Sequence, residues 1–305
     1  MPSVKLRSEW SSLIIPLLSL CLASCGANLS EYKRFANAGK TYASAMDALL
    51  VASGNLFVEA NSVGLLDNDL QNPAKDKLAY ADANNNVDTW LKLTGLAQQH
   101  TDLLRRYFVA LENLAASDNP RKSRETTERI FAQLNSVGTL IRPSLLTNPL
   151  VSDEAGKTYS RIPEFIISNK IKGELRSEIQ ARKEAIYKEL VTQELTQKLL
   201  SRQIRKNLVS IQSSKDRLTV KKEYVSPVPI SNPQRWIDQR SAIRRLTLSI
   251  AGLEAASDAS IKFKEAFVEL VDDRLTISRA NALLDEVDAL LKTVSDLQTA
   301  TGHKE

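Results

Sequence analysis

The sequence predicts an all-α protein, built as an elongated antiparallel bundle of long, coiled-coil-like helices. Leu, Ala, Lys, Glu, Gln and Arg dominate its composition, and all of them form helices readily. Glycine and proline, which interrupt helices, occur only ten times each among 305 residues. Apolar residues recur at three, four or seven positions over stretches longer than an ordinary globular helix. Such helices need partners, because an isolated helix is only marginally stable in water.

The first predicted helix covers residues 29 to 66 and opens an N-terminal helical region, residues 25 to 142. Its apolar residues repeat at a spacing of seven, which is typical of a narrow seam packed against a neighbouring helix. The seam consists of Phe35, Tyr42, Leu49, Leu56 and Val63. The polar stretch "LDNDLQNP" is expected to be the loop that ends this helix.

Two further helices are predicted in the same region. One covers residues 74 to 116 and is expected to weaken at residues 84 to 86, which are all Asn. The other runs from 120 to 140 and is expected to stop near Arg142 and Pro143, because proline removes a backbone donor. In three of the four Asn-Pro pairs, proline stands where it fits a first helical turn: Pro73, Pro120 and Pro233.

The rest of the chain is predicted to be an irregular connection, residues 143 to 162, followed by a long helical hairpin, residues 163 to 305. The hairpin consists of one helix over 163 to 211 and a second over 233 to 299, packed with the N-terminal helices as one bundle. The proline-rich stretch "YVSPVPISNP" joins them and cannot be helical. A break is expected in the second helix near Gly252 or at Asp272-Asp273.

Both cysteines of the chain lie four positions apart near its start. Lys5 and Arg7 precede an apolar segment, residues 10 to 23, that is too short to span a bilayer as a permanent helix. The segment ends in Leu22-Ala23-Ser24-Cys25, which resembles the lipobox of bacterial lipoproteins. This resemblance covers only the first 25 residues. It implies that residues 1 to 24 are a signal peptide and that Cys25 is the lipidated first residue of the mature protein.

The resemblance also implies a location. Gly26 follows the cysteine where an Asp would favour retention at the inner membrane, so in a Gram-negative cell the protein is expected at the periplasmic face of the outer membrane. Cys21 leaves with the signal and acylation consumes Cys25, so no disulfide is expected. The alternatives are an ordinary secretory signal with a chance cysteine, or a cysteine buried in a first helix.

Charge is distributed unevenly along the chain. Positions 161 to 245 contain nineteen basic and nine acidic residues. From position 246 onwards there are six basic and eleven acidic residues. Around the proline-rich connection this excess predicts a candidate anion-binding surface. The alternative interpretation is a solvated helix face whose cations pair with glutamates at helical spacing. The candidate residues are Lys215, Arg217, Lys221, Lys222, Arg235, Arg240, Arg244 and Arg245.

Motifs that carry chemistry are missing from the sequence. The glycines are scattered singly, so it contains no G-x-G-x-x-G loop and no G-x-S-x-G elbow. His100 and His303 are the only histidines, which argues against a histidine-centred triad or a zinc site. His100 is predicted to be a surface or half-buried helical residue. We therefore expect no catalytic residues, no metal site and no cofactor.

These observations predict a membrane-anchored, non-enzymatic scaffold or docking protein of the cell envelope. The expected partners are a membrane through the lipid anchor, and either another protein or a second copy of the chain. Anionic lipid is a further candidate, while export argues against nucleic acid. The main alternative is a membrane-active helical protein that binds anionic lipid through residues 212 to 245. A third is an envelope enzyme that uses carboxylates contributed by several helices.

Overall fold

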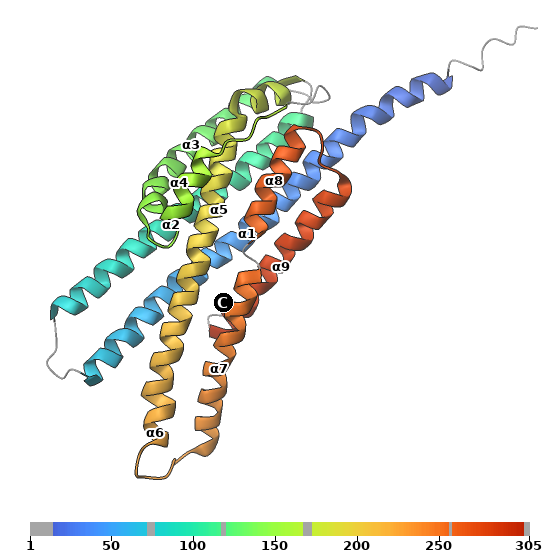
Figure 1. Ribbon diagram of the computed structural model, residues 1–305. Helices are drawn as coiled ribbons and strands as arrows, with labels where there is room; N and C mark the ends of the chain where they lie inside the picture. The colour runs from blue at the N-terminus through green and yellow to red at the C-terminus, as the bar shows by residue number, and fades with distance from the viewer. Residues whose placement is uncertain (1–14, 72–76, 117–119, 167–172, 256–257, 302–305) are drawn as a thin grey trace, which may run out of the picture.

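The protein is an all-α helical bundle, as the sequence predicts. In the computed structural model the backbone is described for residues 15–71, 77–116, 120–166, 173–255 and 258–301, and side chains for 31–69, 79–114, 121–166, 173–246 and 258–299. All regular structure in these segments is helical. The long helices lie side by side in one bundle (Figure 1).

Helix α1, Ile15–Gln71, is the longest element and extends about 85 Å at 1.5 Å per residue. The predicted seam is confirmed, since its five residues, Phe35, Tyr42, Leu49, Leu56 and Val63, are all buried. Residues 31 to 69 of this helix are also long and apolar enough to cross a membrane by length and composition. Its large aromatic and aliphatic seam residues pack in the bundle core, and 33% of its most apolar window is buried inside the protein.

Three helices follow and complete the N-terminal part of the bundle. Helix α2, Lys77–Ala116, packs along α1, and α3, Pro120–Thr147, packs along α2. The short helix α4, Ser152–Ser160, contacts α3 and the next long helix. Pro120 opens α3 as predicted, and Asn148-Pro149 lies in a turn.

Helix α5, Gly173–Lys215, is the central helix of the bundle. It contacts α1, α2, α3 and α4 on the N-terminal side. Between Ile186 and Leu200 almost every side chain is buried, whether apolar or polar, so this part of α5 is enclosed on all faces. The chain continues from α5 into a π-helix, η1, Asp216–Lys221, and a last short turn, α6, Lys222–Tyr224.

The return limb of the hairpin consists of three helices. Helix α7, Pro233–Ala255, runs back along α5 and starts at the predicted proline. Helix α8, Ala259–Val271, continues in the same direction, and α9, Ile277–Thr301, reverses and packs on α1 and α7 (Figure 1). The break at Asp272-Asp273 is confirmed, and Asp273 adopts a left-handed φ of 58° there.

Four sequence predictions about helix ends are wrong. The "LDNDLQ" part of the predicted loop is helical, since α1 runs to Gln71, and the three asparagines do not interrupt α2. Helix α3 continues through Pro143, because Ile141 and Leu145 on either side are fully buried and this packing outweighs the missing backbone bond. The connection predicted as irregular therefore contains the end of α3 and all of α4.

The fourth wrong prediction is the start of the long helix of the hairpin. Pro163 does not open it, since α5 begins at Gly173, and its helical course extends past the predicted end to Lys215. Residues 161 to 166 have no regular secondary structure. Phe165 packs edge-on against Tyr187 and Phe267, and the Ile166 N–H donates to Asp272 Oδ1 at 3.2 Å. These contacts with α5 and the end of α8 hold the segment in a non-helical form.

The core is continuous through the bundle. Its aromatic centre joins α1, α2 and α8, where the Phe35 ring stacks on Phe263 at 4.9 Å and meets Phe108 edge-on at 5.0 Å. Buried apolar side chains extend from this centre along α3, α5 and α9. Helices from both halves of the sequence thus share one core.

Candidate functional site

The candidate anion-binding residues fall into two groups in the structure. Lys215 and Arg217 form ion pairs with Glu59 and Asp67 of α1, so they fasten the α5 to α7 hairpin to its neighbour. These two cations are paired, but with acids of another helix and not with glutamates at helical spacing on their own helix. The other six residues are exposed, and none forms an ion pair with any acidic side chain that the structure describes. They are Lys221, Lys222, Arg235, Arg240, Arg244 and Arg245.

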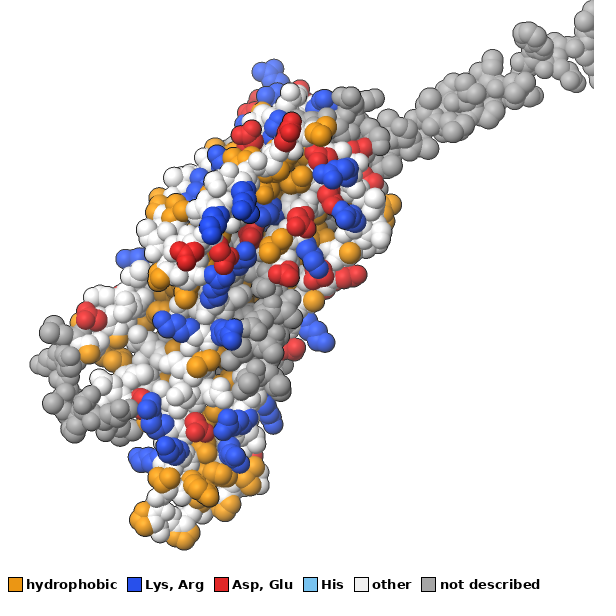
Figure 2. Space-filling model, in the orientation of Figure 1, with side chains coloured by type: hydrophobic (Ala, Val, Ile, Leu, Met, Phe, Trp, Pro, Cys, Tyr) orange, Lys and Arg blue, Asp and Glu red, His pale blue; other side chains and the backbone are white. Residues whose placement is uncertain are grey.

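These six cations surround the end of the hairpin, where α6 and the proline-rich connection lead into α7. We call residues 221 to 245 the hairpin tip. It lies at the end of the molecule opposite the start of α1 (Figure 1). Figure 2 shows apolar side chains gathered at this end, with Lys and Arg side chains just behind them. Six of the eight basic residues predicted from the sequence are therefore exposed near this end of the hairpin.

The hairpin tip is held in shape by an aromatic cluster. The indole N–H of Trp236 donates to the Val220 carbonyl of η1 at 3.0 Å. The Trp236 ring stacks on Tyr224 at 6.1 Å, and the Arg240 guanidinium lies over it at 5.6 Å. Helix α7 is capped by Asn232, whose side-chain oxygen accepts the Arg235 N–H at 3.0 Å. Trp236 thus joins the start of α7 to η1 and α6.

Large apolar side chains at the hairpin tip are open to solvent, which sequence reasoning missed. Tyr224, Val225 and Val228 are exposed by 70%, 66% and 68%, and Ile237 by 49%. An exposed apolar cluster with a charged rim is typical of an interaction surface. The signal was present in the sequence as the apolar letters of "YVSPVPI", which had been interpreted only as a helix breaker.

A second polar feature is enclosed in the bundle, and it corrects the prediction for His100. This side chain is only 1% exposed. Its Nε2 lies 2.9 Å from Glu189 Oε2, and its Nδ1 accepts from the Gln193 amide at 2.7 Å. The same amide donates to Thr101 Oγ1 at 3.0 Å. With Nδ1 accepting, the imidazole carries its proton on Nε2 and donates it to the carboxylate.

Helix α3 completes this buried network. Arg142 donates to the other oxygen of Glu189, so both carboxylate oxygens are paired. Gly138 lies one turn before Arg142, and a Cβ there would be 3.0 Å from the Glu189 carboxyl carbon and closer still to one of its oxygens. The sequence places a glycine where α3 must pass this carboxylate closely.

Two more carboxylates of α5 are buried and paired. Glu194 forms ion pairs with Lys198 and with Lys264 of α8. Glu178 accepts the Tyr107 hydroxyl at 3.2 Å and pairs with Arg182. Burial raises the pKa of Glu178 above its ordinary range, although the Arg182 charge opposes that shift. These groups join helices to one another inside the bundle.

The hydroxyl of Tyr159 is coupled to the same region. It shares a hydrogen bond of 3.0 Å with Thr192 Oγ1 of α5, and burial raises its pKa to about 12. The phenol therefore remains protonated at neutral pH and serves as a neutral hydrogen-bonding group between α4 and α5.

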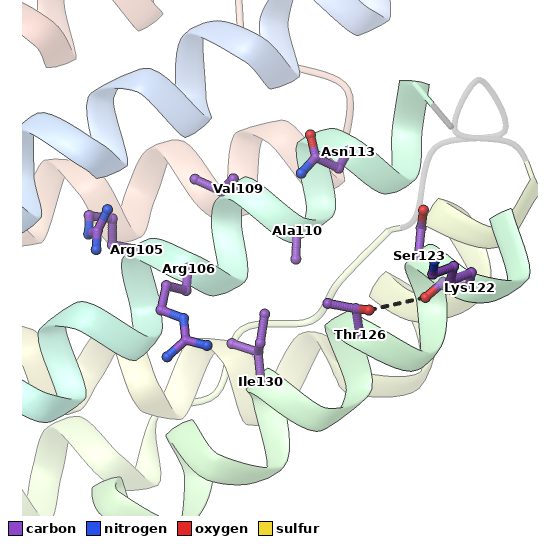
Figure 3. A pocket seen from close by; sticks show the side chains of 9 residues that line it. All are labelled: Arg105, Arg106, Val109, Ala110, Asn113, Lys122, Ser123, Thr126 and Ile130. Atoms are coloured by element: carbon purple, nitrogen blue, oxygen red, sulfur yellow. Dashed lines mark hydrogen bonds between the residues drawn. The ribbon is translucent and has the colours of Figure 1, made fainter. Parts of the chain in front are cut away.

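A groove of about 420 Å³ lies between α2 and α3 (Figure 3). Val109, Ala110 and Ile130 form its apolar part, while basic side chains border it. Two of these cations, Arg105 and Arg106, pair with Asp102 on the same helix. Among the lining residues that the structure describes there is no Asp, Glu, His or Cys, so they supply no acid and base pair. The lining consists of Arg105, Arg106, Val109, Ala110, Asn113, Lys122, Ser123, Thr126 and Ile130.

Other candidate positions are less informative. Cys25 lies in the part of α1 for which only the backbone is described, so its side chain is outside the described residues. Across the described side chains, no group of three His, Cys, Asp or Glu lies close enough to hold a metal ion.

No protein-family model, curated protein sequence or solved structure matches this chain.

Proposed function

We propose that this chain is a lipid-anchored, non-enzymatic protein of a bacterial cell envelope, whose helical bundle carries a docking surface. The observation that carries the proposal is the position of the lipobox-like stretch Leu22-Ala23-Ser24-Cys25. It stands just ahead of Tyr32 and Phe35, which are buried core residues at the start of the part of α1 whose side chains are described. A lipid on Cys25 would therefore tether the bundle through the start of its longest helix.

The arrangement of the hairpin supports a docking role. The start of α1 and the hairpin tip lie at opposite ends of the molecule (Figure 1). Several acyl chains hold a protein stably on a bilayer, whereas one holds it only marginally. An anchor at one end would leave the exposed cations and apolar side chains at the other end free to meet a partner.

The buried polar groups support a non-enzymatic role. His100, Glu189 and Glu194 are paired with one another or with neighbouring cations, and solvent hardly reaches them. A general acid or base must lie within hydrogen-bonding reach of its substrate. Their positions suit them to joining helices.

The anchor is tested by expressing the full chain in a Gram-negative bacterium and analysing its N-terminus by mass spectrometry. The expected product begins at Cys25, carries acyl chains and fractionates with the outer membrane. Cys25→Ser should leave an uncut, unlipidated precursor. Cys21→Ser is the matched control, because this cysteine is removed with the signal, and it should be processed normally. An uncut and unmodified N-terminus in the unsubstituted protein would overturn the proposal.

The non-enzymatic part has its own test. The purified protein is incubated with peptidoglycan and with ester substrates, and we expect no turnover above a heat-denatured sample. Robust hydrolysis that Glu189→Gln abolishes would overturn this part and favour the carboxylate enzyme instead.

A further inference from the structure

The hairpin tip combines three surface properties: exposed aliphatic side chains, aromatic rings at their edge, and cations that pair with no acid whose side chain the structure describes. We propose that the hairpin tip docks on a membrane, with its apolar apex entering the interfacial region of an anionic bilayer and its cations contacting lipid headgroups. The apex consists of Tyr224, Val225 and Val228, and the basic collar of Lys221, Lys222, Arg235, Arg240, Arg244 and Arg245.

The apex is suited to a shallow position in lipid. Val225 and Val228 are about two-thirds exposed, so water covers most of their apolar surface in the free protein. Moving that surface into lipid is favourable. Pro227 and Pro229 have no backbone N–H, and the Val228 N–H already donates to Ser226 Oγ at 3.2 Å. Few backbone donors would therefore lose a water partner on insertion.

Aromatic side chains link the apex to the collar, because Tyr224 of the apex stacks on Trp236 and Arg240 of the collar lies over the Trp236 ring. Trp and Tyr favour the membrane interface, where one part of the ring is apolar and another can hydrogen-bond. Trp236 and Tyr224 stack there, and the bond from Trp236 to Val220 fixes the pair to the end of η1. The rings are thus held in position before any membrane is met.

The collar supplies attraction to negative charge. From Lys215 to Arg245 the chain carries eight cations and three acids, Asp216, Glu223 and Asp238. After Lys215 and Arg217 have paired with α1, six cations remain for a partner. A cation close to an anionic membrane typically strengthens binding about fivefold, and salt screens this attraction. The four arginines lie within about 15 Å of one another along α7, and Lys221 and Lys222 lie where η1 meets α6.

A lipid surface fits these properties better than an acidic protein. The apolar residues form the outermost point of a narrow hairpin, as the lower end of Figure 2 shows, rather than the floor of a groove. A bilayer can close around such a convex point, and its headgroups then lie level with the collar. An acidic polypeptide would satisfy the collar while leaving the apex in water.

Membrane docking by the hairpin tip has one consequence that rests on the proposed function. If Cys25 anchors the start of α1, the opposite end is directed toward a second surface, and the protein would join two membranes. Docking of the tip itself does not require the anchor, so the two are tested separately.

The test uses the chain from Gly26, which keeps every side-chain contact described above and contains no cysteine. It is floated with vesicles of phosphatidylcholine alone or with added phosphatidylglycerol. We expect binding to the anionic vesicles at low salt, loss at high salt and no binding to neutral vesicles. Absence of binding at low salt, or equal binding to both vesicles, would overturn the proposal.

Variants locate the binding on the tip. The charge variant Lys221→Gln, Lys222→Gln, Arg235→Gln and Arg244→Gln should weaken binding at least tenfold. Its matched control removes four exposed cations elsewhere and should bind like the parent chain: Lys33→Gln, Lys92→Gln, Arg129→Gln and Lys292→Gln. Equal weakening by both sets would overturn the assignment to the tip. Circular dichroism and thermal unfolding verify that each variant is folded.

Insertion has a separate readout. Val228→Cys is labelled with an environment-sensitive fluorophore, and its emission should shift to the blue on anionic vesicles. Leu140→Cys on α3, which is also exposed, is the labelled control and should not shift. Binding without a shift at position 228, together with equally salt-sensitive binding to soluble polyglutamate, would point to an acidic protein partner and overturn docking on a membrane.

Discussion

Glu189 Oε2 lies 2.9 Å from Nε2 of His100, and both side chains are almost completely excluded from solvent. The contact joins α2 to the central helix α5, and Arg142 of α3 binds the second carboxylate oxygen. A buried carboxylate is costly unless its oxygens are paired. The network therefore makes the mutual placement of these three helices depend on a few polar contacts.

His100→Ala is expected to destabilise the protein by about 3 kcal/mol, because it leaves one oxygen of a buried carboxylate without its donor. Denaturant unfolding of the chain from Gly26 measures the change. Gln99→Ala is the control, since it removes an exposed neighbour on the same helix and should change the free energy of unfolding by less than about 0.5 kcal/mol. Equal effects of the two substitutions would contradict the paired arrangement.

Gly138→Ala should be destabilising by more than about 2 kcal/mol, although alanine favours helix formation over glycine. The new methyl group would collide with the Glu189 carboxylate, which is held from both sides and cannot move away. Gly95→Ala offers the opposite case, because nothing lies within 4 Å of its Cβ position.

Gly95→Ala is the control and should raise the free energy of unfolding by about 0.5 to 1 kcal/mol. Both variants are compared by thermal and denaturant unfolding. A stabilising Gly138→Ala would show that Glu189 does not occupy the space beside α3.

Local patterns predicted much of the fold. The seam of α1 was readable because a spacing of seven places residues on one helix face, and all five of its residues are buried. Pro120 and Pro233 marked helix starts because proline fits a first turn. At Pro163 and Pro143 the predictions are wrong because tertiary packing outweighs the local preference of proline. Packing of Phe165 keeps the segment before α5 non-helical, and burial of Ile141 and Leu145 lets α3 continue through Pro143.

The polar features of the interior could not be predicted in this way. His100 and Glu189 are separated by 89 positions, so their pairing depends on how α2 and α5 pack. At the hairpin tip, the sequence indicated which cations gather but not which are free. Lys215 and Arg217 are neutralised by acids of α1 about 150 positions away, which only the assembled bundle shows.

Glu178→Gln should make stability less dependent on pH. Burial raises the pKa of this carboxyl in the folded protein, so the folded chain holds the proton to higher pH than the unfolded chain. The associated stabilisation is complete below the ordinary glutamate pKa of about 4.3 and is lost as pH rises through the raised value. Glutamine resembles the protonated acid and can still accept the Tyr107 hydroxyl.

The variant should therefore match the parent chain in free energy of unfolding near pH 4 and be more stable than it at pH 7. Denaturant unfolding at the two pH values measures this difference. Glu125→Gln, which changes an exposed carboxylate, is the control and should give the parent stability at both. A larger deficit of Glu178→Gln at pH 7 than at pH 4 would show that pairing with Arg182 outweighs burial.

Trp236→Phe should loosen the hairpin tip without unfolding the bundle. Phenylalanine can keep the stacking on Tyr224 but cannot donate to the Val220 carbonyl, and one lost hydrogen bond typically costs about 1 kcal/mol. We expect faster amide hydrogen exchange in η1 and α6, measured by mass spectrometry. Trp90→Phe is the matched control, because the buried Trp90 indole has no hydrogen-bond partner among the described groups. Trp90→Phe should leave amide hydrogen exchange at the hairpin tip unchanged. Equal acceleration by both variants would show that the hydrogen bond from the Trp236 indole to η1 does not hold the tip in shape.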